Sequence, residues 1–504
     1  PVVIVGAGMA GPTLALALAK RGVPAVVLDE DDTVSLGSRS ICQAKHSLET
    51  WDRFGVASRM VEKGITWEQG ELYLHDKPVF RFNLQPEPGH KFPAFVNLQQ
   101  YYVEEYLFER CLAEPLIEMR FCNKVVAVTP GEEGVTLEVE TPDGGYALDA
   151  EWLVACDGVR STVRHLMDLP YPGEVFHDRF LISDIRLLSE LPKERRFWFY
   201  PPFHPTNSVL LHRQADNVLR VDFQLGPDAD PEEEKKPENI DRRLRQMFGP
   251  EARWEHEWTS VYTFTCRMME RFVHGRVIFA GDAAHVVSPF GARGGNGAIA
   301  DVDNLAWKLA MVLRDAAPAS LLDSYCSERR AAAQENILNS TRSTDFITPK
   351  FAASRAFRDA TLSLARDFPF ARALINSGRL SVPTAQPGSP LDTPDADAEW
   401  LRGPGPGRAM LDAPVGRDGS GWLLDRLGPD FTVLTFGGTD MPTGDLPSGV
   451  TCVRIAGDGL ARQRYDARPG TTYLIRPDRY VAARWRSFDA AAIAAAVTRA
   501  TGNG

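Results

Sequence analysis

The stretch VVIVGAGMAG, Val2 to Gly11, decides the first part of the fold. Its four aliphatic residues predict a short buried strand, and the G-x-G-x-x-G pattern that follows predicts a turn over Gly6 to Gly11. Thr13 to Lys20 then reads as a helix, and Ala25 to Leu28 reads as a second buried strand. Together these segments predict a βαβ unit, in which a helix connects two parallel strands.

Each glycine of this pattern has its own expected role. Gly6 makes the tight turn, Gly8 lets the backbone approach a pyrophosphate, and Gly11 lets the helix pack closely on the strand. The helix N-terminus offers amide donors and a positive dipole end to phosphates. Asp29 closes the next strand, where its carboxylate is expected to hold ribose hydroxyls. In this context the pattern favours dinucleotide binding over a plain tight turn.

Composition excludes several classes of protein. The chain has 504 residues, of which 44% are apolar and 24% charged, so two or three globular domains are expected. No apolar run approaches the roughly 20 residues that span a bilayer, and the start of the chain lacks the basic residues of an export signal. The net charge of −11 disfavours nucleic acid and anionic membranes as partners.

Cysteine usage indicates a reducing compartment. The seven cysteines are scattered and include no Cys-x-x-Cys pair, which argues against a disulfide framework, a zinc site and dithiol redox chemistry. We therefore expect a cytoplasmic protein with no metal site.

Two further turn sequences follow predicted strands. ACDGVRS, with Asp157 and Gly158, follows Trp152 to Ala155, and GDAAH, with Gly281 and Asp282, follows Arg276 to Ala280. Either one alone is typical of an ordinary strand-to-turn junction. With GAGMAG before them and PFGARGGN after them, they resemble the fingerprints of flavoprotein aromatic hydroxylases, the single-component monooxygenases typified by para-hydroxybenzoate hydroxylase. The resemblance covers roughly residues 1 to 340.

The resemblance implies FAD as cofactor, with NADPH or NADH as cosubstrate, and no second G-x-G-x-x-G is present. Asp282 would hold the ribityl chain, Asp157 with Gly158 would lie near the pyrophosphate, and Pro289 to Asn296 would line the isoalloxazine ring. The implied cofactor-binding residues are Gly6, Gly8, Met9, Ala10, Gly11, Asp29, Glu30, Arg39, Gln100, Asp157, Gly281, Asp282, Pro289, Gly291, Gly294, Gly295 and Asn296.

The implied activity is hydroxylation of a phenolic or related aromatic substrate. In such enzymes NAD(P)H reduces the flavin, O2 adds at C4a, and the hydroperoxide delivers one oxygen to the ring, while the protein excludes water. Two alternatives stay open. One is a flavin-dependent oxidoreductase with other chemistry, such as dehydrogenation, and the other is a non-catalytic flavin- or ligand-binding protein.

Candidate substrate residues follow in part from the same resemblance. Tyr262 stands where phenol hydroxylase-like proteins place an active-site tyrosine, although a core tyrosine is the alternative, and the Pro289 carbonyl could accept a bond from the substrate hydroxyl. Ile41 stands where relatives carry an Asp or His base, which is the only support for a non-catalytic protein. If that segment is extended, Gln43 and Lys45 share its face.

The predicted sheet offers two further candidates, His212 and Arg220, which lie on strands and could pair with a substrate carboxylate. A purely structural pairing is the alternative for each.

The chain divides into several expected parts of α/β and α+β class. A discontinuous Rossmann-like FAD-binding domain takes 1–75, 95–175 and 268–340, and a β-sheet substrate domain takes 76–94 and 176–267. A helical segment, 341–381, precedes a proline-rich linker, 382–407. Residues 408–504 resemble the thioredoxin-like module of the phenol hydroxylase branch. This module lacks the cysteine pair, which implies packing or a homodimer contact.

Overall fold

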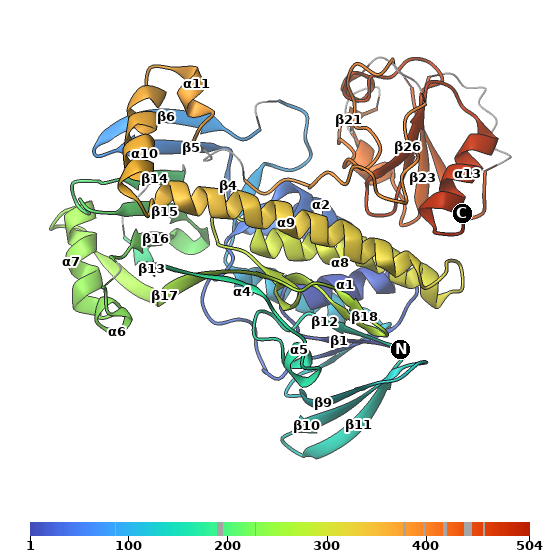
Figure 1. Ribbon diagram of the computed structural model, residues 1–504, viewed down its shortest axis with the longest axis horizontal. Coiled ribbons are helices and arrows are strands. Elements are labelled where there is room, and N and C mark those ends of the chain that lie inside the picture. The colour runs from blue at the N-terminus through green and yellow to red at the C-terminus, as the bar shows by residue number, and fades with distance from the viewer. Residues whose placement is uncertain are drawn as a thin grey trace.

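The structure is a computed structural model that describes residues 1–85, 87–188, 195–226, 228–375, 380–396, 399–416, 421–437, 446–456 and 459–504. Figure 1 shows a long helix, α9, running between the substrate sheet at one end and a separate C-terminal module at the other. Within these residues, no helix is both long enough and apolar enough to cross a membrane.

The βαβ prediction for the first residues is confirmed. β1 (Val2–Val5) pairs in parallel with β2 (Ala25–Leu28) on one side and with β12 (Trp152–Ala155) on the other. The sheet order is β18 (Val273–His274), β19 (Val277–Phe279), β12, β1, β2 and β8 (Ile117–Arg120). All four residues of β1 are buried, as a strand covered on both faces requires.

Helices cover this sheet closely. α1 (Ala10–Ala19) is buried at nine of its ten positions and packs against α4 (Gln100–Leu112) and α8 (Gly294–Leu313). A separate antiparallel sheet consists of β9 (Lys124–Pro130), β10 (Val135–Thr141) and β11 (Gly144–Ala150). In Figure 1 this small sheet lies on the side of the molecule away from the C-terminal module.

Among the described residues, the expected substrate sheet has eight strands. Their order is β20 (His285–Val286), β17 (Trp254–Met268), β13 (Gly173–Leu187), β16 (Val218–Gln224), β15 (Ser208–Arg213), β14 (Arg195–Phe199), β5 (Gln69–Leu74) and β6 (Lys77–Asn83). β5 pairs in parallel with β14, so the chain enters this sheet by Gln69 and not after residue 75, as the sequence suggested.

The two faces of this sheet have different partners. Leu181, Leu211 and Phe223 lie on the face that packs against Ile240 and Leu244 of α7 (Pro237–Phe248), which follows α6 (Pro231–Glu234). On the other face, Phe197 pairs across from Leu210, and Leu210 pairs across from Asp222. Because α7 seals the first face, the second is the one available for a site.

A short sheet connects the two larger ones. It consists of β3 (Cys42–Ala44), β7 (Phe95–Asn97) and β4 (Ile65–Trp67), and it lies beside α2 (Lys45–Asp52) and α3 (Ala57–Lys63). α5 (Thr162–Leu166) follows β12 and is capped by the Ser161 side chain, which accepts from Arg164 N. α9 (Leu321–Ile347) runs through the boundary expected at residue 340, and α10 (Ala352–Ala365) and α11 (Pro369–Arg372) follow it.

The C-terminal module contains a four-stranded sheet in the order β24 (Val450–Ile455), β23 (Phe431–Phe436), β25 (Thr472–Ile475) and β26 (Val481–Trp485). α12 (Leu460–Arg464), α13 (Ala490–Ala500) and the hairpin of β21 (Pro414–Val415) and β22 (Gly421–Trp422) complete it. The segment expected to be a linker is packed: the Thr384 carbonyl accepts from the Tyr480 hydroxyl at 3.0 Å.

A buried charge network joins this module to the nucleotide-binding part. Glu328 on α9 accepts from Lys308 of α8 at 2.6 Å and from Arg476 at 2.7 and 3.0 Å. Arg476 also donates to Asp478, which accepts from Asn304 at 3.0 Å. Glu328, Lys308, Arg476 and Asp478 have side chains at most 2% exposed. Such a network holds elements together because each charge needs all of its partners.

Replacing Glu328 by Ala should strongly destabilise the fold, because it leaves the Lys308 and Arg476 cations buried without their shared carboxylate. We expect a loss of about 3–5 kcal/mol in the free energy of unfolding, measured by urea denaturation. The control is Glu399→Ala, whose carboxylate is 73% exposed and 3.4 Å from Arg468. That change should cost less than about 1 kcal/mol. Equal losses for the two variants would contradict the importance assigned to the network.

Asp392 gives the junction a pH dependence. Its side chain is buried beside this network, and neither carboxylate oxygen has a hydrogen-bond partner among the described residues. Burial raises the pKa of Asp392 to about 7, with Glu328 adding to the rise and Arg476 opposing it. The fold therefore favours the protonated carboxyl, and the stability that this provides is lost as the pH rises through about 7.

We expect Asp392→Asn to remove this part of the pH dependence, since an amide does not ionise. As the pH rises from about 5 to 7, where the unfolded chain has lost this proton and the fold still holds it, the wild-type midpoint of thermal unfolding should fall relative to that of the variant, measured in the same buffers. Parallel curves for the two proteins over this range would show that Asp392 does not titrate there.

Candidate functional site

The glycine-rich turn after β1 leaves space at one position only. A Cβ at Gly6, where φ is +103°, would lie 2.5 Å from the Cys156 carbonyl, and one at Gly11 would lie 2.0 Å from the Gly6 carbonyl oxygen. Both glycines are therefore required by the fold itself. A Cβ at Gly8 would meet only Glu104 Oε1, at 3.8 Å. This free backbone surface next to the start of α1 fits the pyrophosphate of a dinucleotide.

Acidic side chains lie around this turn. Asp29 Oδ2 accepts from Ala7 N at 2.5 Å, so one oxygen of the expected ribose ligand also fixes the turn. Glu30 is exposed, and its carboxylate lies 3.8 Å from Lys124 Nζ. Asp157 Oδ2 accepts from Val163 N at 3.0 Å, and its buried Oδ1 has no partner within the described residues. An orphaned buried oxygen of this kind is available to a bound ligand.

Gln100 is held by local hydrogen bonds at the start of α4. Its Oε1 accepts from Ser40 N at 3.0 Å, and its Nε2 donates to Glu104 Oε1 at 2.7 Å. The carbonyl of Arg39 accepts from Arg220 at 3.1 Å. The predicted flavin contacts Arg39 and Gln100 thus lie in the same loop region, near Gly8, and their contact with FAD stays a prediction.

Asp282 follows β19 in a short 3-10 turn, Gly281–Ala283. Its carbonyl accepts from the Tyr171 hydroxyl at 2.8 Å, whereas its carboxylate makes no hydrogen bond to the described part of the chain. Burial raises the pKa of Asp282, and the nearby His285 opposes the rise. A partly exposed carboxylate without a partner fits the hydroxyl groups expected of a ribityl chain.

A buried triad supports this turn from behind. Asp301 of α8 accepts from Gly281 N at 3.0 Å, lies 2.7 Å from His285 Nε2, and accepts from Arg329 Nε at 2.7 Å. Burial alone would raise the pKa of Asp301, but His285 and Arg329 outweigh it and hold the pKa below its usual value. His285 is therefore a structural partner of Asp301, which positions the turn that carries Asp282.

The loop after this turn has two kinds of residue. Asn296 is buried and makes four hydrogen bonds, to Ala44 N at 2.8 Å, Ser47 Oγ at 2.7 Å, and the carbonyls of Cys42 and Ala292, each at 2.8 Å. Asn296 thus links α8 to β3. Its side-chain donors and acceptors are all used, so none is left to hydrogen-bond an isoalloxazine ring. Gly291, Gly294 and Gly295 are the loop's bare positions.

These glycines bring the loop close to the first motif. A Cβ at Gly295 would lie 2.8 Å from Met9 Cε and 2.8 Å from Ser40 Oγ, so the glycine-rich loop touches the turn that carries Met9 and Ala10. Gly291 has φ +94°, which an L side chain rarely adopts. Pro289 is exposed, and its carbonyl accepts from Ala292 N at 3.2 Å. The glycine-rich loop therefore presents a surface of backbone atoms with few side chains, which we call the wall, next to the turn after β1.

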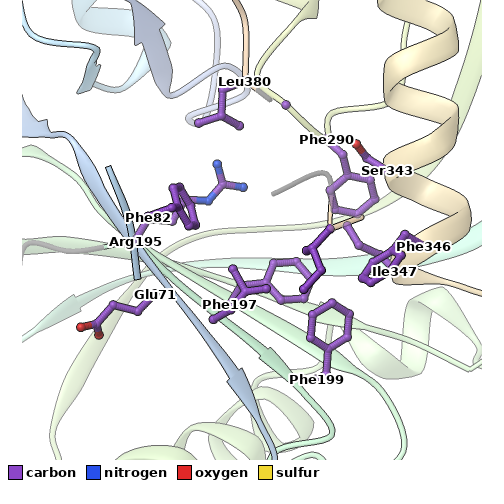
Figure 2. Close-up of a pocket in the computed structure, with 13 residues that line it drawn as sticks. Glu71, Phe82, Arg195, Phe197, Phe199, Phe290, Ser343, Phe346, Ile347 and Leu380 are labelled. Atoms are coloured by element: carbon purple, nitrogen blue, oxygen red, sulfur yellow. The ribbon is translucent and has the colours of Figure 1, made fainter. Parts of the chain in front are cut away.

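An apolar pocket adjoins this wall (Figure 2). The space between its lining residues measures about 580 Å³, part of which is open to solvent. Five phenylalanines dominate it, and the lining residues are Glu71, Leu72, Phe82, Arg195, Phe197, Phe199, Phe290, Gly291, Ser343, Phe346, Ile347, Ile375 and Leu380. β14 of the substrate sheet, the glycine-rich loop and α9 thus enclose one space.

Several predicted substrate residues have other partners. Arg220 donates to Asp184 at 3.0 Å and to Ser38 Oγ at 2.6 Å, so it is neutralised inside the fold. Gln43 Nε2 donates to the carbonyls of Ser40 and Leu98 at 3.3 Å. Lys45 is the first residue of α2, and its Nζ lies 3.1 Å from His90 Nδ1. The shared face expected for Ile41, Gln43 and Lys45 is wrong, because the strand ends at Ala44.

The other candidates lie nearer to the pocket. Ile41 is buried in a cluster with Leu380, which lines the pocket. His212 is buried, its Nε2 is 3.8 Å from Asp222, and its Nδ1 has no partner among the described residues. Burial holds the pKa of His212 well below its usual value, with Arg195 and Arg220 adding to the effect. His212 is therefore neutral near pH 7.

Tyr262 lies on β17 beside Phe264, with ring centroids 6.1 Å apart. Its side chain is 44% exposed, so it is not the core tyrosine of the alternative reading. Partial desolvation by the surrounding protein raises the pKa of Tyr262, and the charge of Asp282 adds to the rise. The phenol therefore stays protonated at neutral pH, where it can donate a hydrogen bond but is a poor base.

The sequence analysis did not identify the phenylalanines of the pocket or Arg195 as site residues. Phe197 and Phe199 stand in RFWFY, which the sequence showed only as a strand of the substrate sheet. Alternation along that strand places Arg195, Phe197 and Phe199 on one face, and this was the available signal. Which face borders the loop at Phe290 depends on contacts between distant segments.

The open position at Gly8 can be tested by adding one methyl group. Gly8→Ala meets no protein atom closer than 3.8 Å, so the fold should tolerate it, whereas the methyl would keep a pyrophosphate from the backbone. We expect unchanged thermal stability of the flavin-free protein and at least a roughly tenfold weaker FAD affinity, measured by flavin fluorescence.

The matched control is Gly11→Ala, whose methyl would lie 2.0 Å from the Gly6 carbonyl oxygen. That change should lower the thermal stability of the flavin-free protein as well as FAD binding. Normal FAD affinity in the Gly8→Ala protein would show that the cofactor does not approach this turn.

Comparison with known proteins agrees with this geometry. The chain is 30% identical over 391 residues to a 3-(3-hydroxy-phenyl)propionate/3-hydroxycinnamic acid hydroxylase of Mycolicibacterium gilvum, covering 77% of this chain and 68% of the relative. For the hydroxylase of the same description from Mycolicibacterium smegmatis the identity is 29% over 368 residues, with 73% of this chain covered and only 65% of the relative's length.

A solved structure extends the similarity to the full chain. The flavin-dependent monooxygenase PieE, in complex with FAD and substrate, has a TM-score of 0.84 at 20% identity, covering 100% of this chain and 99% of PieE, and it establishes likeness of fold. The family described as FAD binding domain matches residues 1–340, about two thirds of the chain. This protein therefore belongs to the FAD binding domain family of flavoproteins, the family that its fingerprints resemble.

Proposed function

We propose that this protein is an FAD-dependent monooxygenase that uses NAD(P)H and O2 to hydroxylate a phenolic or related aromatic substrate. One observation carries the proposal: Phe290 and Gly291 of the glycine-rich loop line the same apolar pocket as Phe197 and Phe199 of the substrate sheet. A ring held in this pocket lies against the loop that the resemblance assigns to the isoalloxazine. When bound, FAD supplies reduction by NAD(P)H and activation of O2.

The chain's own contribution is a dry, aromatic enclosure. Phe180, Phe264 and Phe290 pack with centroids 5.1–5.4 Å apart beneath the loop, and Phe199 packs edge-on against Phe346 of α9 at 6.0 Å. Such contacts leave little room for water beside the substrate ring. Exclusion of water matters for this reaction, because it favours transfer of oxygen to the ring over loss of peroxide.

Orientation of the substrate hydroxyl is assigned to two groups. We propose that Tyr262, whose phenol stays protonated, and the exposed carbonyl of Pro289 contact the hydroxyl. The carboxylate of Glu71 does not serve as a base, because it points away from the pocket in Figure 2 and pairs with Arg196 at 3.3 Å. The names of the two mycobacterial relatives extend the proposal to phenols with a short carboxylate side chain.

The activity can be tested with purified yellow protein, NADH or NADPH, O2 and a panel of phenols that begins with 3-(3-hydroxyphenyl)propionate. We expect oxidation of the nicotinamide to rise at least about tenfold with one or more panel members, and the product to gain 16 mass units. The substitution Gly291→Ala adds a methyl group to the pocket wall and strains a backbone with φ +94°. We expect it to reduce this activity.

Two other results would replace the proposal. Substrate-stimulated reduction of flavin without oxygen insertion would indicate a dehydrogenase or another flavin-dependent oxidoreductase. A flavin that NADH and NADPH fail to reduce, with every panel member present, would indicate a flavin- or ligand-binding protein without this activity.

A further inference from the structure

We propose that the Arg195 guanidinium binds a carboxylate on the molecule that occupies the phenylalanine-lined pocket. The inference deepens the proposed function and rests on it, because it assigns the pocket to aromatic acids in preference to neutral phenols. It makes Arg195 the residue that determines specificity in this pocket.

The position of Arg195 carries the first step. It is the first residue of β14, and its guanidinium points into the pocket between Leu380 and the side of Phe290 (Figure 2). Apart from Glu71 and Ser343, the other lining residues are phenylalanines, aliphatic residues and one glycine. The Glu71 carboxylate points away from this space in the same view. Arg195 therefore supplies the positive charge of an otherwise apolar enclosure.

The second step is that the fold leaves this guanidinium without a counter-ion. Within the described residues, Arg195 has no hydrogen bond and no ion pair, and its recorded contact is with the Trp67 ring, 5.7 Å from Cζ to the centroid. The charge of the Asp222 carboxylate opposes this isolation by raising the pKa of Arg195, but the two groups form no ion pair. Asp222 lies beside His212 instead, at 3.8 Å. Burial lowers the pKa of Arg195, which shows that its charge is poorly compensated.

Two other arginines of the same sheet have their positive charge balanced by a carboxylate of the protein. Arg220 pairs with Asp184 at 3.0 Å, and Arg196 pairs with Glu71 at 3.3 Å. The fold thus supplies a carboxylate to each of them. An arginine that lacks one costs stability in the unliganded protein, and a carboxylate on a ligand offsets that cost while matching the planar fork of the guanidinium.

The third step is the geometry of the pocket along its length. In Figure 2, the ring of Phe290 and the guanidinium of Arg195 face the same space from opposite sides. A ring beside the loop therefore directs a substituent toward Arg195. Since both features line the same pocket, one ligand can contact both.

Calorimetric titration of the oxidised FAD holoenzyme, without NAD(P)H, tests this assignment. The ligands are 3-(3-hydroxyphenyl)propionate, 3-hydroxybenzoate and their primary amides, which keep the shape and remove the charge. We expect wild type to bind at least one acid about tenfold or more tightly than its amide. Arg195→Met should weaken binding of that acid by roughly 10–100-fold and change binding of its amide by less than about threefold.

Matched variants separate this role from a structural one. Arg196→Met alters the next residue of β14, whose side chain pairs with Glu71, and it should keep the preference for the acid. Arg195→Lys keeps the charge and should retain part of the preference. Melting curves of each holoenzyme identify variants with a damaged fold. If Arg195→Met is damaged, the affinities of Arg195→Lys for acid and amide are compared with those of wild type instead.

Three results would overturn the assignment: equal affinity of wild type for acid and amide, a preference that survives Arg195→Met, or no binding of either acid. The proposed function fails separately. If the acids bind through Arg195 but are not hydroxylated, the carboxylate site stands and the monooxygenase activity does not. If neutral phenols are hydroxylated equally well by wild type and Arg195→Met, the activity stands and the carboxylate site does not.

Discussion

The buried carboxylate of Glu328 is the interaction on which the arrangement of the domains depends. It binds Lys308 of α8 and Arg476 of the C-terminal module, and its Oε2 also accepts from Asn304 at 2.8 Å. Because water does not reach these groups, each charge is satisfied only when α8, α9 and the 476–478 turn are all in place. The position of α8 is therefore fixed by partners outside the nucleotide-binding sheet.

The site inherits its geometry from this constraint, because α8 begins inside the glycine-rich loop. Asp301, two turns into that helix, holds the Gly281 amide and His285, while Asn296 at its start holds β3. The loop that forms one wall of the pocket is thus fixed at both ends. The C-terminal module contributes to this arrangement through Arg476 and Asp478.

The sequence predicted strands best where a continuous run of apolar residues marks a buried strand. Val2–Val5, Ala25–Leu28 and Trp152–Ala155 have the predicted bounds because strands covered on both faces are continuous apolar runs. The glycine turn and the acidic residues of the FAD fingerprints were likewise visible as local patterns. The placement of β5 in the substrate sheet was not visible, because its pairing with β14 joins segments more than 100 residues apart.

Charge balance explains why the substrate residues were harder to predict than the cofactor residues. Arg220 and Arg195 look equivalent in the sequence, since both lie on strands of the same sheet. Arg220 meets Asp184 of β13 and Ser38 of a distant loop, whereas Arg195 faces the aromatic pocket. Only the assembled fold shows which buried charge already has its counter-ion.

The same criterion distinguishes the two ends of the proposed site. Asp301 is neutralised by Arg329 and His285, and its role is to hold the turn. Asp282 lies in the turn that Asp301 holds, and its carboxylate makes no hydrogen bond to the described residues. The guanidinium of Arg195, in the pocket, likewise makes none. Uncompensated charge in a partly buried hollow costs a protein stability unless a ligand completes it. This is why we propose Asp282 for the cofactor's hydroxyls and Arg195 for the substrate.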